Sequence, residues 1–369
     1  MNNAIVLGTL AGAALLALIL RVYLVRSRSA RSHELTAARP HQFEPPSAAP
    51  AIPEQKKHAD SDQSEGWTAA AIRERFFCLA FDVPARGFEM DGPHLAVLQR
   101  SQRALDDVVQ RAEYFPRRPM LLPQLLRAVN DTDSTRREIA EVVLQDAVLT
   151  GDVLKLVNSS FYRVSPGAIE NVERAVVILG TEGLKAVVAT SLMQPIFRVR
   201  EEYFKNFSGL LWEYSLRAAK AANAYAARTR KCDRFAAHLI GLIGSTGPLV
   251  LFRVLSESYK REPQLVPNAE GFIRLIGEHG DRASELIASS WAISEQFLHA
   301  MQEQSREDPP ALRTPLGVAA YYSRLCAQLS ILADHGILSA EAAKSCLLDL
   351  GLDDDLVVAM WGALQTDKS

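Results

Sequence analysis

The sequence has few cysteines and no excess of charge of either sign. Its 369 residues include four cysteines, which lie far apart and form no C-x-x-C pair. This spacing argues against a zinc site and a disulfide framework, so reduced thiols are expected. Lysine and arginine total 41 against 43 aspartates and glutamates. No basic excess is present to neutralise a nucleic-acid backbone, and nucleic acid is not an expected partner.

Charge is also missing from the first twenty residues. Residues 4–20 form an apolar run, AIVLGTLAGAALLALIL, which resumes after Arg21 and continues to Val25. Twenty-two helical residues span about 33 Å, which is enough to cross a bilayer. A cleavable signal peptide is the alternative, but it begins with positive residues, whereas here the arginines follow the run. We expect residues 1–26 to be a transmembrane anchor, with the rest of the chain in the cytoplasm.

Small residues repeat within this anchor. Ala4, Gly8 and Gly12 lie four residues apart, so they share one face of the expected helix. Such a stripe lets two membrane helices pack closely and predicts a homodimer, although glycine and alanine are also common in membrane helices without that role. Residues 27–66 follow as a polar, proline-rich segment with few large apolar side chains. Their composition predicts a disordered linker.

From Trp67 onward the pattern is helical. Apolar residues return at steps of three and four, and no sustained alternation indicates a strand. The predicted fold class is therefore all-α. We divide this part into a helical lead-in at residues 67–112, a large helical domain at residues 113–335, and C-terminal helices at residues 336–369 that pack on it.

Several short motifs in the large helical domain are more specific than the helical repeat of apolar residues. They are Leu122-Pro123, the helix start Asp146-Ala147-x-Leu149-Thr150, the segment Leu156-Val157-Asn158-Ser159-Ser160, the helix end Ala175-Val176-x-x-Leu179-Gly180, then Leu211-Trp212, Gly241-Leu242-Ile243 and Gly247-x-Leu249. In this order and spacing, residues 113–335 resemble the HDOD domain of bacteria. The family usually has proline where Ala147 stands. The resemblance implies an all-α fold related to HD phosphohydrolases, and for the anchor it implies the bacterial inner membrane.

The signature residues also have structural interpretations: Pro123, Asp146, Asn158, Ser159, Gly180, Trp212, Gly241 and Gly247. Asn158 and Ser159 are expected to end a helix, where asparagine tolerates left-handed backbone geometry; ligand binding by Asn158 is the alternative. Gly180 is expected just beyond a helix C-terminus. The glycines from Gly241 to Gly247 lack the lysine of a phosphate-binding loop and follow a helix, so they predict a close helix–helix contact.

The resemblance also identifies positions where metal ligands are missing. HD phosphohydrolases bind a divalent metal through a histidine on one helix and a His-Asp pair on another. Here Tyr214 stands at the first position, and Gly244 and Ser245 stand at the pair. Further family histidines correspond to Gly280 and to the region of Glu303-Gln304. His238, on an apolar helix, is expected to be a hydrogen-bonded core residue.

These observations favour a non-enzymatic signalling or scaffold protein. We expect no catalytic residue, no metal and no cofactor, and an HDOD-like domain that binds protein partners or a small signal. The alternative is a metal-dependent phosphohydrolase of nucleotides or cyclic dinucleotides, which the ancestry suggests. The sequence identifies neither the partner nor the pathway.

Overall fold

The computed structural model describes residues 66–84, 90–108, 116–125, 136–163, 167–199, 202–306 and 313–365. Within these ranges all regular structure is helical, as the sequence predicts. The helices are α2 (Ala69–Ala80), α3 (Gly92–Val108), α5 (Arg136–Leu144), α6 (Ala147–Val157), α7 (Val172–Met193), η2 (Gln194–Phe197), α8 (Phe207–Thr229), α9 (Arg234–Ile243), α10 (Thr246–Lys260), α11 (Ala269–Ser290), α12 (Glu295–Gln302), η3 (Glu303–Ser305), α13 (Pro315–Asp334), α14 (Ala340–Asp349) and α15 (Asp354–Gln365).

Three sequence predictions concern residues outside these ranges. The transmembrane anchor, its stripe of Ala4, Gly8 and Gly12, and nearly all of the proline-rich linker lie outside the described residues.

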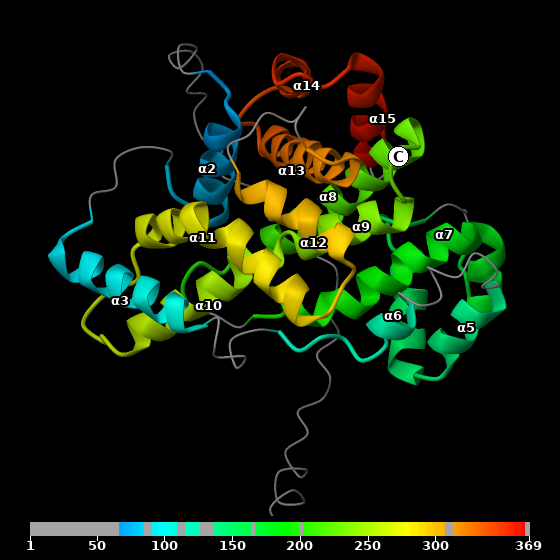
Figure 1. Cartoon of the computed structure of the whole chain (residues 1–369), viewed down its shortest axis with the longest axis horizontal. Helices are drawn as coiled ribbons and strands as arrows, with labels where there is room; N and C mark the ends of the chain where they lie inside the picture. The colour runs from blue at the N-terminus through cyan, green and yellow to red at the C-terminus, as the bar shows by residue number, and fades with distance from the viewer. Residues whose placement is uncertain are drawn as a thin grey trace, which may run out of the picture. The chain divides into compact units, whose positions relative to one another are not determined.

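Helix α8 is the central element of the domain. It packs against α9, α13 and α15, while α10 pairs with α11. Figure 1 shows α13 lying above α11 and α12, with α3 at one end of the domain and α5 and α6 at the other. A second apolar cluster joins α15 to α8 and α13 through Trp361, Met360, Tyr225 and Leu329. The C-terminal helices therefore share their core with α8.

Local sequence sets where many helices begin. The Asp146 carboxylate accepts hydrogen bonds from the backbone N–H groups of Val148 and Leu149 and so caps α6. Such side-chain caps satisfy donors that have no partner within the helix. Other helices begin in the same way, with a side-chain oxygen accepting from the first turn, at Thr68, Asn171, Asp233, Asn268, Ser294, Thr314 and Ser339.

Gly180 interrupts α7. Its φ of +68° and ψ of −177° are non-helical, so the helix stops after Leu179 and resumes beyond the glycine. A residue with a Cβ adopts this backbone region only under strain. The expectation that Gly180 follows a helix end is confirmed.

Gly241 and Gly247 mark two close helix contacts, as their sequence context predicts. A Cβ at Gly241 on α9 would lie 2.5 Å from the backbone nitrogen of Ala219 on α8. A Cβ at Gly247 on α10 would lie 2.1 Å from the carbonyl oxygen of Gly280 on α11. Each pair of backbones therefore approaches more closely than any side chain would allow.

Two stretches, Val172–Phe197 and Arg234–Lys260, are long and apolar enough to cross a membrane by length and composition alone. Of their most apolar windows, 56% and 89% respectively are buried inside the domain. Burial of this extent is typical of core helices, which are hydrophobic on most sides. Their apolar character therefore has a structural explanation in the packing of this domain.

We predict that Gly241→Ala lowers the free energy of unfolding by about 1–3 kcal/mol, because the added methyl group forces α8 and α9 apart. Gly277→Ala on α11 is the matched control, since a Cβ there meets nothing within 4 Å. The control should raise stability by about 0.5–1 kcal/mol through helix propensity. Urea unfolding of both variants measures the difference, and equal effects would contradict the close-contact assignment.

Candidate functional site

The residues that the sequence resemblance places at the metal-ligand positions of HD phosphohydrolases, Tyr214, Gly244 and Ser245, lie on α8 and at the turn between α9 and α10. Tyr214 on α8 is buried, with its ring 5.0 Å from that of Phe76 on α2. Gly244 ends α9, and the buried Ser245 precedes α10. The Ser245 hydroxyl donates to the carbonyl oxygen of Leu242 at 3.0 Å. The only side-chain polar group at these two positions therefore serves the local turn.

Ser284 on α11 ties this turn to the neighbouring helix. Its hydroxyl donates to the carbonyl oxygen of Gly244 at 2.8 Å and accepts the N–H of Gly247 at 2.9 Å. This geometry needs the glycine at position 247, because a side chain there would overlap Ser284. The turn between α9 and α10 is thus held by hydrogen bonds to α11.

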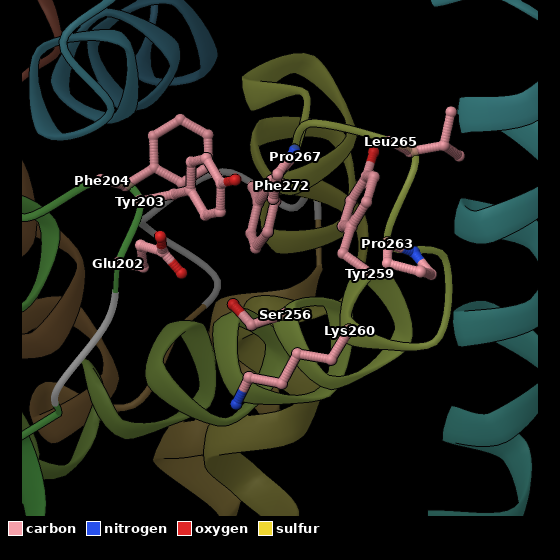
Figure 2. Close-up of a pocket in the computed structure, with 10 residues that line it drawn as sticks. All are labelled: Glu202, Tyr203, Phe204, Ser256, Tyr259, Lys260, Pro263, Leu265, Pro267 and Phe272. Carbon is pink, nitrogen blue, oxygen red and sulfur yellow. The ribbon is translucent and has the colours of Figure 1, made fainter.

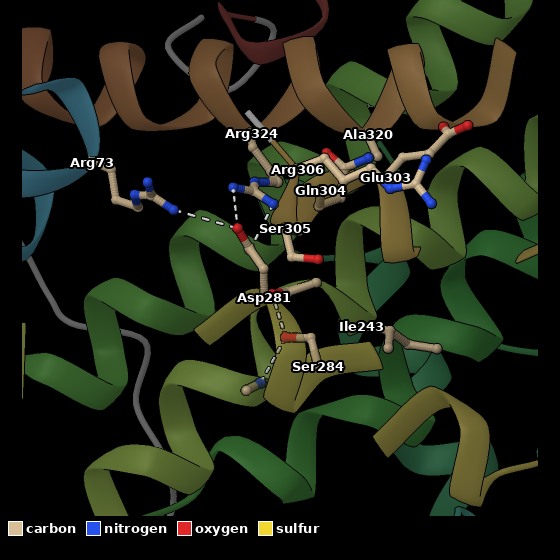
Figure 3. Close-up of polar contacts among 12 residues, drawn as sticks. Arg73, Ile243, Asp281, Ser284, Glu303, Gln304, Ser305, Arg306, Ala320 and Arg324 are labelled. Atoms are coloured by element: carbon tan, nitrogen blue, oxygen red, sulfur yellow. Dashed lines mark hydrogen bonds and ion pairs between the residues drawn. The ribbon is translucent and has the colours of Figure 1, made fainter. Parts of the chain in front are cut away.

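One turn before Ser284, Asp281 is the centre of an ion-pair network. Arg324 on α13 binds both of its carboxylate oxygens, with N–O distances of 2.7 and 3.2 Å. Arg73 on α2 donates to the same carboxylate at 3.3 Å. Figure 3 shows the two guanidinium groups reaching Asp281 from different helices. The Asp281 and Arg324 side chains are each only 17% exposed, so the pair is largely removed from solvent.

Burial and neighbouring charges determine the protonation states of Arg324 and Tyr214. Burial disfavours the charged guanidinium, but the Asp281 carboxylate outweighs it and raises the pKa of Arg324. Burial raises the pKa of the Tyr214 phenol above its usual range, although the nearby Arg324 opposes the shift. At neutral pH the cluster therefore holds a cationic Arg324 beside a neutral phenol.

This set of donors does not fit a divalent metal. A transition-metal site needs imidazole, thiolate or carboxylate ligands with free lone pairs. Gly244 has no side chain, Ser245 and Tyr214 offer neutral hydroxyls, and the Asp281 carboxylate is already bound by two arginines. Among the described residues, no three histidines, cysteines, aspartates or glutamates gather closely enough to hold an ion.

Glu303 and Gln304, in η3, serve the start of α13. The buried Glu303 carboxylate accepts the backbone N–H of Thr314 at 2.9 Å and its hydroxyl at 2.9 Å. Gln304 donates its side-chain amide to the carbonyl oxygens of Ala300 and Gly317. A Cβ at Gly317 would lie 1.8 Å from the Glu303 carboxylate, so a larger residue there would displace that carboxylate. Both residues therefore have structural partners.

The signature residues are spread along the fold. Asn158 ends α6, as the sequence predicts, but in a right-handed conformation with φ of −90° and not in the left-handed geometry that asparagine tolerates. Its amide instead donates to the carbonyl oxygens of Leu154 and Ile169, and its oxygen accepts the Ile169 N–H. These bonds satisfy the helix end without a backbone reversal. Ser159 donates to the Leu156 carbonyl oxygen, and Trp212 packs on Phe197.

The positions of Pro123 and His238 also have structural explanations. Pro123 lies in the first turn of a helical segment described over residues 122–125, where its missing N–H has no consequence. His238 is buried, and its Nε2 lies 3.1 Å from the Thr190 hydroxyl. Burial lowers the pKa of His238 to about 4, so the ring is neutral at physiological pH. The expectation of a hydrogen-bonded core histidine is confirmed.

Sequence reasoning did not find the cavities of the domain. One cavity, of about 420 Å³, is lined by residues of α10 and of the segments beside it. Figure 2 shows its lining side chains, among them the rings of Tyr203, Phe204, Tyr259 and Phe272. The Lys260 ammonium at its base pairs with Glu257 at 3.4 Å. A second cavity, of about 650 Å³, lies between α7, α8 and α9. Their lining residues come from segments far apart in the chain, which no local motif indicates.

The model of the HDOD domain family matches residues 115–307. The chain belongs to the HDOD family. No curated protein matches it. The HDOD match ends within the fold, because α13 lies beyond residue 307 yet packs against α8, α9 and α2.

Solved structures share this fold. A protein of Shewanella amazonensis, provisionally named a metal-dependent phosphohydrolase, is 17% identical with a TM-score of 0.51, over 74% of this chain and 99% of its own. A second Shewanella amazonensis protein, provisionally named a phosphohydrolase, is 21% identical with a TM-score of 0.50, over 74% and 95%. An HDOD domain protein of Geobacter sulfurreducens is 17% identical with a TM-score of 0.46, over 75% and 89%. At these identities the first two comparisons establish the fold alone.

We predict that Arg324→Met lowers the free energy of unfolding by about 3–5 kcal/mol, because it leaves a largely buried carboxylate with Arg73 alone as its cationic partner. The double variant Asp281→Leu with Arg324→Met should recover most of this loss, since neither charge then remains. Arg228→Met is the matched control: its side chain and that of its partner Asp355 are both exposed, at 56% and 76%, and exposed pairs contribute about 0–1 kcal/mol. Chemical unfolding measures all three. A loss for Arg324→Met no larger than that of the control would contradict the network's structural role.

Proposed function

We propose that this HDOD protein is a membrane-anchored, non-enzymatic signalling or scaffold protein that binds protein partners or a small signal. One observation carries the proposal. At the junction where HD phosphohydrolases hold a metal, the Asp281 carboxylate is bound by the arginines of two other helices, and Tyr214, Gly244 and Ser245 supply no ligand. A guanidinium has no open coordination position at which to acidify a water nucleophile.

The competing function is metal-dependent phosphohydrolysis. This alternative is suggested by the provisional names of the two Shewanella proteins, which describe them as phosphohydrolases. It requires ligands that supply lone pairs to an ion, and the side chains at the corresponding positions of this chain lack them. The alternative is therefore less well supported than a binding role, and it is open to a direct test.

Exposed apolar side chains support binding to a protein partner. Leu144 on α5, Val148 on α6 and Val177 on α7 are 50%, 73% and 75% exposed. These three helices pack on one another at one end of the domain (Figure 1). Large apolar side chains left in water on neighbouring helices favour a surface that another protein covers.

The proposed anchor rests on the sequence of residues 1–26. Its uninterrupted apolar run and the arginines that follow it favour a single span with the HDOD domain on the cytoplasmic side of the inner membrane. The proline-rich residues 27–66 would then separate the domain from the bilayer.

We predict that the purified full chain hydrolyses neither bis-p-nitrophenyl phosphate, nucleotides nor cyclic dinucleotides, with or without added Mn²⁺. The physical reason is that no side chain at the former ligand positions activates water. The double variant Gly244→His with Ser245→Asp should remain nearly inactive, because Tyr214 still stands at the position of the first histidine.

The control for this assay is removal of contaminating enzymes. Turnover that survives repeated purification and disappears with a chelator would contradict the non-enzymatic proposal.

We also predict that a fluorescent protein fused after Ser369 is fluorescent in the cytoplasm and sediments with membranes. Deleting residues 1–31 should move the folded domain to the soluble fraction, because none of the described core residues is lost. A reporter enzyme at the same site that is active only in the periplasm would reverse the proposed topology.

A further inference from the structure

The cavity beside α10 is lined mainly by aromatic and apolar side chains. Its volume of about 420 Å³ lies within the range of ligand pockets, roughly 300–1,000 Å³. The rings of Tyr203, Phe204, Tyr259 and Phe272 are joined there by two prolines and a leucine of the loop between α10 and α11. No residue of the Asp281 network lines this cavity, so the two sites are separate.

The aromatic walls of this cavity are fixed by contacts within the protein. The Tyr259 hydroxyl lies 3.0 Å from Nδ1 of His94 on α3, and its ring stacks on that of Phe272, with centroids 5.9 Å apart. The Phe204 ring lies edge to face on those of Phe81 and Phe272, at 5.0 and 5.2 Å. Phe204 has a left-handed backbone with φ of +55°, so its packing must offset a conformation that bulky residues rarely adopt. A ligand would therefore meet walls that are already in place.

A hydroxyl group without a partner lies among these apolar groups. Ser256 on α10 is only 9% exposed and lines the cavity, and its Oγ makes no hydrogen bond with the residues that the structure describes. Buried serines such as Ser323 and Ser330 instead donate to backbone carbonyl oxygens of the preceding turn. In Figure 2 the Ser256 hydroxyl points from α10 toward the aromatic side chains. A hydrogen bond from a ligand would satisfy a group that folding has largely removed from water.

The charged residues of the lining are exposed. Lys260 pairs with Glu257 at 3.4 Å, and both side chains are in contact with solvent. Glu202 is also exposed, so water and salt screen its carboxylate. A charged ligand would lose its hydration among the aromatic rings without gaining a buried ionic partner. The lining therefore favours an uncharged ligand.

We propose that this cavity binds an uncharged, planar aromatic small molecule that carries a hydrogen-bonding group, with its ring against the aromatic walls and that group at the Ser256 hydroxyl. Contacts between aromatic rings add to the burial of apolar area, and a serine hydroxyl can donate or accept. This inference rests on the proposed function, because it names the chemical class of the small signal and its site.

Equilibrium dialysis of the full chain against four related probes tests the proposal. 2-Naphthol is planar, uncharged at neutral pH and carries one hydroxyl. Naphthalene lacks the hydroxyl, decahydro-2-naphthol lacks the aromatic rings, and 2-naphthoate carries a negative charge. 2-Naphthol should bind saturably, one per chain, and more tightly than each of the other three. A blank without protein gives the uptake of each probe by the solubilising medium.

Ser256→Ala should weaken the binding of 2-naphthol by about three- to ten-fold, as expected for one lost neutral hydrogen bond, and leave the binding of naphthalene unchanged. Tyr203→Leu should weaken the binding of both, and because Tyr203 is 43% exposed the core stays intact. Ser258→Ala is the matched control on α10: its hydroxyl accepts from Ser101 at 2.8 Å and does not line the cavity. This control should bind 2-naphthol as the wild type does.

Three results would overturn the inference: no saturable binding of 2-naphthol, binding of any other probe as tightly as 2-naphthol, or equal binding of 2-naphthol by Ser256→Ala and the wild type. None of the probes contains a phosphoester, so their binding is independent of hydrolysis. A failed titration would remove this site and leave the non-enzymatic function standing. Hydrolysis of bis-p-nitrophenyl phosphate would contradict that function and leave the binding site in place.

Discussion

The carboxylate of Asp281 is the constraint on which the arrangement of α2, α11 and α13 depends. A charge so far removed from water must be paired, and here its partners are on α2 and α13. Three helices that are distant in sequence are therefore fixed to one point. Helix α13 in turn packs along α8, which carries Tyr214. Loss of this pairing would leave an uncompensated charge in the middle of the domain.

The same junction connects fold and function. The positive charge there is Arg324, which is covalently part of α13, and the turn between α9 and α10 is held by Ser284. Side chains of the described residues therefore join these helices directly. On the proposed function, the fold is kept as a binding scaffold.

Local features were predictable from sequence and distant ones were not. The cap at Asp146 and the break at Gly180 follow from backbone chemistry that neighbouring residues determine. Gly241 and Gly247 predicted close helix contacts, but not their partners on α8 and α11. The pairing of Asp281 with Arg324 joins residues 43 positions apart, and periodicity assigns each to a helix without showing that they meet. Asn158 was correctly predicted to end a helix, but its hydrogen bonds to Ile169, eleven residues away, could not be read from the local sequence.

The account's central claim is that a guanidinium–carboxylate network, and not a metal, holds this junction. The most direct measurement is the thermal unfolding midpoint of the full chain with excess chelator and with excess Mn²⁺, together with the metal content of the purified protein by mass spectrometry. The account predicts far less than one transition-metal ion per chain and the same midpoint in both conditions. One tightly retained ion per chain, with a midpoint that falls when the chelator removes it, would contradict the account.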